Sequence, residues 1–197
     1  MLAVGAPLSE DEMSGRLGVG AAEVASRVAA LCGAGAVESG AAPDGFVRFR
    51  LTSEGRRRSA EVLRRERATL GDVLVSVLPE FERSNRDLKE LLHRWQVKSL
   101  GTSQVANDHR DERYDEQILR ELGGLVAAAG PWLERLANER RRYARYRDRI
   151  RSAVERAGRG EIDYVSGIRV DSVHSVWWQL HADLLGVLGR ARADADV

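Results

Sequence analysis

The sequence predicts a mainly α-helical protein with one small β-hairpin in its first third. Two observations support this fold class. After residue 52, apolar residues recur at intervals of three and four, which is the spacing of one face of an α-helix. Before that point, two short helical patterns precede two β-type segments that flank a turn rich in Gly and Pro. The chain therefore combines a small α+β segment with a longer all-helical part.

A short helix, a turn and a second helix are expected first. Ser9 and Glu12 have the spacing of a capping box, which begins a helix that ends near Gly18. A second helix is expected over residues 21–31, where it is followed by a glycine-rich stop. The residues on its expected buried face are Val24, Val28 and Leu31.

Two strands are expected at residues 36–39 and 46–51, around a turn at Gly40–Gly45. Helix, turn, helix and two-stranded ribbon is the order of elements in a winged helix. Because only six residues precede the turn at Leu8, the first helix of such a domain is expected to be reduced or missing. We therefore predict a truncated winged-helix domain at residues 1–70 and an all-helical ligand- or partner-binding domain at residues 71–197.

The junction after the second strand resembles that of a known class of regulators. Leu51-Thr-Ser-Glu-Gly-Arg56 is similar to the L-T-x-x-G-R motif of bacterial winged-helix regulators, including MarR-like ones, and residues 17–31 are similar to their turn and recognition helix. The resemblance implies transcription regulation through DNA, read by a homodimer with paired half-sites. The candidate DNA-binding residues are Ser26 and Arg27 in the recognition helix, and Arg48 and Arg50 in the wing.

Charge leaves a second interpretation of this segment open. Residues 1–51 contain four arginines and six acidic residues, a net charge of −2, and an acidic surface repels phosphates. A winged helix that serves as a platform for protein interaction or dimerisation is therefore an equal alternative. The sequence contains neither an apolar run of about 18 residues nor a signal peptide, so we expect a cytoplasmic protein without a membrane partner.

The rest of the chain is expected to be helical, with breaks at prolines and glycines. A long helix begins at the N-cap Thr52 and ends where Pro79 interrupts it, and it is expected to couple the two domains. Gly130–Pro131 marks a second break, because proline is favourable at the first position of a new helix. Further helices are expected over residues 80–97, around 114–125 after a loop at 98–108, over 131–157 and over 171–190.

The last of these helices carries two histidines and an acid among apolar residues. Asp171, His174, Trp178 and His181 follow each other at intervals of three and four, so both imidazoles are expected to point into the protein. The seven residues between the histidines correspond to about 10.5 Å of helix rise, which is too far for one metal ion. We therefore assign no metal, and the stretch is interpreted as one wall of a Trp-lined pocket or core.

Other predicted helices supply candidate polar partners for this wall. Arg147 falls on the apolar face of its helix, and an inward arginine needs a carboxylate or an anionic ligand. A loop that carries Asn, Asp and His together, as at residues 107–109, is a typical place for functional groups. The candidate ligand-binding residues are Asn85, Trp95, Gln96, Asn107, His109, Arg147, Arg149, Asp171, His174, Trp178 and His181.

Several motifs of the second half resemble an actinobacterial family. Trp95-Gln96, Asn107-Asp-His109-x-Asp111, Arg145-Tyr-x-x-Arg149-Ile150 and the stretch from Asp171 to Leu185 occur there in the same order. These proteins look like a MarR-type winged helix joined to an all-helical domain, and some resemble partners or fusions of phosphoenolpyruvate-utilising mobile domains, which implies such a protein as a partner. The relatives have tyrosine at position 173, and glutamate at 179 and 182. Val173 implies a changed ligand, whereas Gln179 and Ala182 are expected at the surface.

The residues leave three roles open for this half of the chain. It is a sensing domain that binds a small molecule or partner for the regulator, or part of an enzyme or accessory subunit of a biosynthetic pathway, or a hydrogen-bonded core without a site. As an enzyme it would use His174, His181, Asp171 and His109 for acid–base chemistry, with the winged helix as scaffold. No nucleophile elbow, P-loop, GxGxxG or CxxC motif occurs. The sequence does not identify a cofactor, ligand or substrate.

Overall fold

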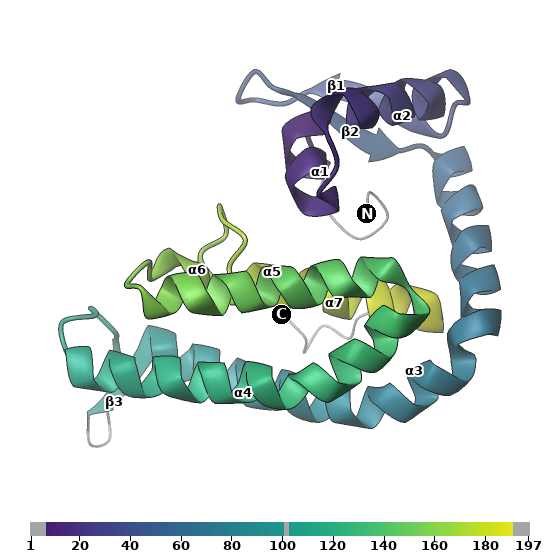
Figure 1. Ribbon diagram of the computed structural model, residues 1–197. Helices are drawn as coiled ribbons and strands as arrows, with labels where there is room; N and C mark the ends of the chain where they lie inside the picture. Colours follow the sequence, from purple (N-terminus) through teal and green to yellow (C-terminus); the bar gives the residue numbers. More distant parts are fainter. Residues whose placement is uncertain (1–6, 101–102, 191–197) are drawn as a thin grey trace. The chain divides into compact units, whose positions relative to one another are not determined.

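A computed structural model describes residues 7–100 and 103–190 of the chain. These residues form seven helices and two antiparallel hairpins, which confirms the predicted mainly α fold (Figure 1). The chain divides into two compact units. The N-terminal unit contains the residues up to Gly71 together with those from His181 onward, and the helical unit contains Asp72–Leu180. The predicted stub of a first helix falls on residues 1–6, which lie outside the described residues.

The N-terminal unit contains the predicted small helices and hairpin. They are α1 (Glu10–Leu17), α2 (Ala21–Gly33), β1 (Val37–Ala41) and β2 (Val47–Leu51), followed by the first part of α3 (Ser53–Gln96). β1 and β2 pair antiparallel, with Ser39 opposite Phe49. Each element lies within about two residues of its predicted position, because capping, glycine and turn signals mark its ends.

The capping box of α1 also connects the helix to the hairpin. The Ser9 hydroxyl accepts a hydrogen bond from the Glu12 backbone N–H (3.2 Å), and the Glu12 carboxylate accepts one from the Ser9 N–H (2.7 Å). The same carboxylate oxygen binds Arg48 of β2 at 2.7 Å, and Arg48 also binds Asp44 in the hairpin turn at 2.7 Å. Arg48 therefore fastens the hairpin to the start of α1.

A single apolar cluster holds the N-terminal unit together. Leu8 forms an antiparallel bridge to Phe49, with N···O distances of 3.2 and 2.9 Å, and so adds an edge to the hairpin. The prediction that Leu31 is buried is wrong, since 43% of it is exposed. Cys32, four residues after Val28, packs against the cluster in the last turn of α2 instead. The buried members are Leu8, Met13, Val24, Val28, Val37 and Phe49.

The junction between β2 and α3 explains the residues of the L-T-x-x-G-R motif. The Thr52 hydroxyl donates to the Gly35 carbonyl (2.7 Å) and accepts from the Gly55 N–H (3.0 Å), while the Thr52 N–H donates to the Ala36 carbonyl (3.1 Å). Gly55 is buried, and a Cβ there would lie 1.9 Å from the Ala36 carbonyl oxygen. The backbone of α3 therefore approaches β1 more closely than any residue other than glycine allows.

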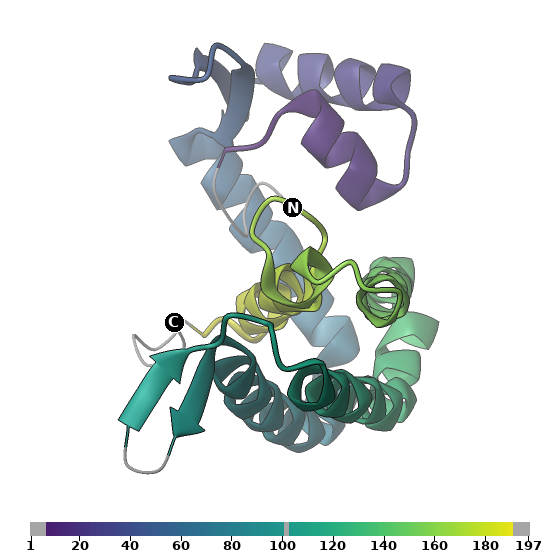
Figure 2. The ribbon, with the colours of Figure 1, turned by 90° about the vertical axis from the view of Figure 1, so that its left-hand side faces the viewer.

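The helical unit consists of long helices with a hairpin beside them. Figure 2 shows the long helices nearly end-on. The elements are the rest of α3, β3 (Val97–Leu100), β4 (Ser103–Ala106), α4 (Glu112–Glu139), α5 (Arg141–Gly158), α6 (Asp163–Ser166) and the first half of α7 (Val173–Leu188). The hairpin β3–β4 replaces part of the predicted loop at 98–108. Half of its strand residues are polar, and they lack the alternation that would have indicated strands.

Both predicted proline breaks are wrong. Pro79 lies inside α3 and Pro131 lies inside α4, and both prolines are exposed. Buried residues flank each one closely, such as Val77 and Phe81 around Pro79. The packing of both flanks outweighs the lost backbone hydrogen bond. α4 ends at Arg140 instead, where φ −144° and ψ 120° take the backbone out of the helix.

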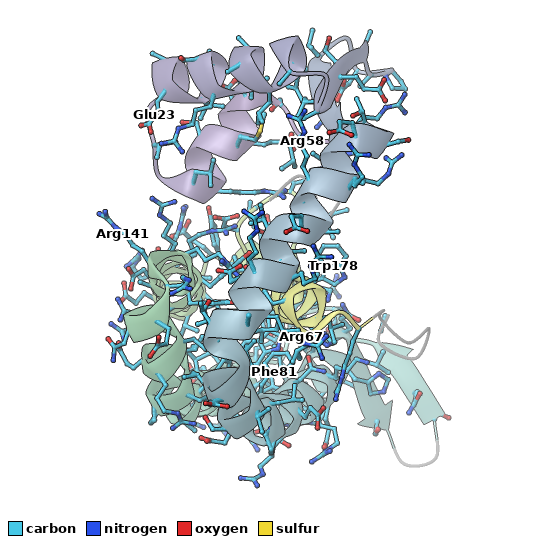
Figure 3. The ribbon with its side chains drawn as sticks, turned by 90° about the vertical axis from the view of Figure 1, so that its right-hand side faces the viewer. Glu23, Arg58, Arg67, Phe81, Arg141 and Trp178 are labelled. Carbon is cyan, nitrogen blue, oxygen red and sulfur yellow. The ribbon has the colours of Figure 1, made fainter. Side chains whose placement is uncertain are left out.

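Three aromatic rings form the centre of the helical unit. Phe81 lies 5.7 Å from Trp132 and 5.9 Å from Trp177, and the two indoles lie 5.7 Å apart with their planes at 88° (Phe81 is labelled in Figure 3). Each indole N–H has an acceptor: Ser84 Oγ for Trp132 (3.3 Å) and Asn85 Oδ1 for Trp177 (3.1 Å). Asn85 thus stabilises the core. In the part of the chain that the structure describes, none of the helices has the apolar length needed to cross a bilayer.

The close approach at Gly55 makes a testable prediction. Gly55→Ala should lower the free energy of unfolding by about 2–3 kcal/mol, because the new Cβ collides with a backbone carbonyl that cannot move freely. Gly15→Ala is the control, since Gly15 is exposed in α1 and its Cβ would meet open space. It should stabilise by about 0.5–1 kcal/mol. Urea unfolding followed by circular dichroism measures both, and equal effects would contradict the proposed close contact.

The pKa of Glu12 makes a second prediction. Burial opposes ionisation of this carboxyl, but hydrogen bonds from Ser9 and the charges of Arg48 and Arg16 outweigh it, so its pKa lies below the usual 4.5. A lowered pKa in the folded state adds stability that is present above about pH 4.5 and lost as the pH falls through the folded-state pKa.

Glu12→Gln should therefore destabilise the protein by about 0.5 kcal/mol at pH 7, and the difference from the wild type should disappear as the pH falls through the lowered folded-state pKa of Glu12. Thermal unfolding as a function of pH measures this difference. Glu10→Gln is a control in the same helical turn and should cost less at pH 7. A Glu12→Gln deficit that stays constant with pH would argue against the ion pair with Arg48.

Candidate functional site

The polar candidates of the helical unit gather in two separate clusters. The first, here called the His109 cluster, consists of Trp95, Asn107, His109 and Asp115. The second, here called the Arg149 cluster, consists of Arg149, Asp171 and Gln179. All seven residues lie within the helical unit.

Asn107 organises the His109 cluster from the end of β4. Its backbone N–H donates to the Gln96 carbonyl (2.8 Å), which closes the base of the β3–β4 hairpin. Its Nδ2 donates to the Trp95 carbonyl (2.9 Å) and to Asp115 Oδ1 (2.9 Å). Its Oδ1 accepts the backbone N–H of His109 (3.1 Å). The Asn107 side chain, only 9% exposed, therefore fixes the chain between the hairpin and α4.

His109 is held in an unusual conformation beside Asp115. Its Nδ1 lies 2.9 Å from Asp115 Oδ2, and its ring centroid lies 4.3 Å from that of Trp95. Among the described residues, it is the one non-glycine residue with a positive φ, at 57°. The side chain of His109 is 27% exposed and that of Asp115 is 12% exposed. A side chain in this backbone region, next to a buried carboxylate, is typical of functional sites.

The hydrogen bonds determine where the imidazole carries its proton. Asn107 Nδ2 has two hydrogens, and the Trp95 carbonyl and Asp115 accept both. The 3.2 Å approach of Nδ2 to His109 Nδ1 is therefore not a hydrogen bond. Because a carboxylate only accepts, Nδ1 carries the proton and donates it to Asp115. The lone pair of a neutral imidazole then lies on Nε2.

Asp115 is the functional residue that sequence reasoning missed. Together with Ile118 and Leu122 it forms a stripe at intervals of three and four, and all three are buried. An acid on the apolar face of a helix needs a partner, which was the available signal. The loop prediction did identify Asn107 and His109, whereas the Gln96 side chain is exposed outside the cluster.

The Arg149 cluster joins α5 to the start of α7. Arg149 binds both carboxylate oxygens of Asp171 at 2.7 Å and donates to Gln179 Oε1 at 3.1 Å. The Arg149 side chain is 14% exposed, and Gln179 is 9% exposed. The expectation that Gln179 lies at the surface is therefore wrong. This bidentate geometry holds two elements together and leaves Arg149 little freedom to bind a ligand.

Arg147 is partly buried, with 22% of its side chain exposed. It binds the Glu134 carboxylate at 2.7 Å and the neighbouring Asp148 at 2.7 Å, so it has the carboxylate partner that an inward arginine needs. Arg149, with 14% of its side chain exposed, is the more buried of the two arginines. Two residues correspond to about 200° around a helix, so the two arginines leave α5 on nearly opposite sides.

Only one of the two α7 histidines is buried. His181 is 7% exposed, whereas His174 is exposed and 39% of Trp178 is exposed. The prediction that both imidazoles and Trp178 face inward is therefore wrong for His174 and Trp178. The buried stripe of α7 is centred on other positions, and Val173 is one of them. The pocket that the sequence predicts around His174 therefore lacks its main polar residue. The apolar members of the stripe are Val173, Val176, Trp177, Leu180, Leu184 and Val187.

Two grooves of the helical unit have linings that contain no residue of these clusters. One, of about 370 Å³, lies between α3 and α4 and includes Arg94, Glu121 and Trp132 in its lining. Another, of about 360 Å³, lies between α4 and α5 and includes Arg147 and Arg151. Within residues 7–100 and 103–190, no three His, Cys, Asp or Glu side chains are arranged to hold a metal ion.

The candidate DNA-binding arginines all have acidic partners. Arg27 binds Glu23 and Arg50 binds Glu38, and both arginine side chains are about two-thirds exposed, at 66% and 68%. Arg48, bound by two carboxylates, is only 28% exposed. The fourth candidate, Ser26, is exposed on α2.

No protein-family model matches the sequence, and no curated protein or solved structure is significantly similar to it.

Arg149→Lys tests the structural role of the Arg149 cluster. Lysine keeps the charge but not the planar pair of donors, so the free energy of unfolding should fall by about 1–2 kcal/mol. Arg151→Lys is the matched control on the same helix, because Arg151 is exposed and has no partner among the described residues. It should change the stability by less than about 0.5 kcal/mol. Indistinguishable thermal unfolding curves for the two variants would show that the bidentate pair does not stabilise the fold.

Proposed function

We propose that the protein is a DNA-binding regulator whose N-terminal unit is a winged helix, and whose helical unit binds a small ligand or a partner. The observation that carries the proposal is the order of elements around one apolar cluster. A bridging strand residue at Leu8 precedes α1, α2 and the β1–β2 hairpin, and the Thr52–Gly55 junction leads into α3. In a winged helix, α2 would enter the major groove and β1–β2 would be the wing.

Two of the three candidate arginines are suited to contact DNA, and the third holds the hairpin in place. Arg27 on α2 and Arg50 on β2 each bind one acid at the surface. Surface ion pairs contribute only about 0–1 kcal/mol, so these arginines can exchange a carboxylate for a phosphate. Arg48 is half-buried between Glu12 and Asp44, and we assign it to holding the hairpin rather than to DNA. Ser26 supplies a hydroxyl on the same helix as Arg27.

The acidic partners set the expected strength of binding. Glu23 and Glu38 must give up their arginines, and they lie close to where phosphates would be (Glu23 is labelled in Figure 3). The complex should therefore be weak and strongly dependent on salt, unless two copies bind paired half-sites together. A homodimer on DNA is part of the proposal for this reason.

Fluorescence anisotropy with a duplex from the chain's own upstream region tests the proposal. The wild type should bind at about 50 mM salt, and Arg27→Ala with Arg50→Ala should weaken binding and reduce the slope of log K against log salt by about 2, one unit for each lost phosphate contact. Glu23→Gln with Glu38→Gln should instead strengthen binding, because it removes the competing carboxylates.

Arg65→Ala is the matched control. Arg65 is 77% exposed and bound to an acid one turn away, like Arg27, but lies on α3, and its loss should leave DNA affinity unchanged. Absence of binding by the wild type at low salt would overturn the proposal. That result would favour the alternative of a protein-interaction platform, for which the exposed Phe46 (65%) and Val47 (54%) at the hairpin turn are the supporting observation.

A further inference from the structure

We propose that the His109 cluster is a catalytic acid–base site, in which Nε2 of His109 takes a proton from a water molecule that attacks a carboxylic ester. The proposal does not rest on DNA binding, because every residue of the cluster lies in the helical unit. Its basis is the combination of a buried carboxylate, a fixed imidazole tautomer and an unused ring nitrogen.

The backbone at His109 does not need an imidazole. The turn between β4 and α4 is held by the Asn107 side chain, which bonds the Trp95 carbonyl, Asp115 and the His109 backbone N–H. At φ 57°, glycine or asparagine would adopt the same conformation with less strain. The backbone of the turn therefore does not require histidine, whose side chain costs strain that glycine would avoid and donates its hydrogen bond to Asp115 rather than to the turn.

Asp115 gives this imidazole the arrangement of a catalytic dyad. Its Oδ2 accepts the Nδ1 proton at 2.9 Å, while its Oδ1 is held by Asn107 at 2.9 Å, so the carboxylate cannot rotate freely. Trp95, only 2% exposed, lies against the ring and limits its movement. A carboxylate in this position selects the tautomer with a free Nε2 and stabilises the imidazolium that forms when Nε2 takes a proton.

The other ring nitrogen is unused and belongs to a side chain that is partly exposed. Nε2 has no hydrogen-bond partner among the described residues, and the His109 side chain is 27% exposed. By comparison, the two indole N–H groups in the core and both side-chain polar atoms of Asn107 have partners. A base that is oriented on one side and open on the other is the arrangement that general-base catalysis requires.

The proposed step moves one proton in each direction. Nε2 takes a proton from water while the water oxygen forms a bond to the ester carbonyl carbon and the carbonyl π electrons move onto the carbonyl oxygen, and the imidazolium keeps its Nδ1–H bond to Asp115. The carbonyl double bond then re-forms as the C–O bond to the alcohol breaks, and the imidazolium returns the proton to the leaving alkoxide. The balance is ester plus water giving carboxylic acid plus alcohol, and His109 and Asp115 end unchanged.

The full-length chain with 4-nitrophenyl acetate as probe provides the test. Asp115→Asn should lower the rate of hydrolysis about tenfold or more, because an asparagine N–H would donate to Nδ1 and force the proton onto Nε2. His109→Asn should abolish the rate above background, and asparagine suits the backbone conformation, so this variant should fold. Circular dichroism and thermal unfolding establish that both variants are folded.

Diethylpyrocarbonate, which modifies unprotonated imidazole nitrogen, gives a second readout that a structural role would not affect. Peptide mapping should show faster modification of His109 than of the exposed His93, and Asp115→Asn should slow the reaction at His109 about tenfold while leaving His93 unchanged. His93→Asn is the matched control for hydrolysis and should leave the rate as in the wild type. Equal hydrolysis by wild type and folded His109→Asn, or a modification rate at His109 that Asp115→Asn does not change, would overturn the proposal.

Discussion

The contact among Phe81, Trp132 and Trp177 is the constraint on which the helical unit depends. It joins α3, α4 and α7 through edge and stacked ring contacts, and each indole N–H is satisfied nearby, so the cluster is apolar without an unpaired polar atom in its rings. Both polar clusters extend from the same helices. α3 ends in Trp95 and α4 begins near Asp115, and these meet at His109, while α7 carries Gln179 to Arg149. Large aromatic surfaces fix these helices strongly enough for small polar networks to keep a defined geometry at their ends.

Ion pairs between arginines and acidic residues are the second main feature of the molecule. The chain has 31 basic and 30 acidic residues, and many arginines of the described part bind acids one turn away or on a neighbouring element. Where the arginine is exposed, as at Arg27, the pair is weak and exchangeable. Where it is buried and bidentate, as at Arg149, it fixes two elements. The same residue type therefore forms exchangeable surface pairs at some positions and structural pairs at others, and burial decides between these two kinds of pair.

The sequence was most informative where a signal is local. Ser9 with Glu12, and Thr52 with Gly55, fix helix starts through contacts within a few residues, and both were recognisable in advance. Predictions failed where tertiary packing decides. Exposed prolines did not end helices whose flanks are buried, and the assumed inward face of α7 was misplaced, which put His174 outside. Asn107 and His109 were predicted as candidates, but Asp115 became evident only once the turn before α4 was seen.

The backbone conformation of His109 has a consequence for laboratory evolution. Selection for thermostability alone favours glycine or asparagine at a position with φ 57°, because either removes strain without disturbing the hydrogen bonds of Asn107. If selection also requires an imidazole, no residue other than histidine satisfies it. Position 109 should thus change readily under selection for stability alone and stay histidine under selection for activity. A library propagated under selection for stability would therefore reveal whether the chain keeps histidine there for its chemistry.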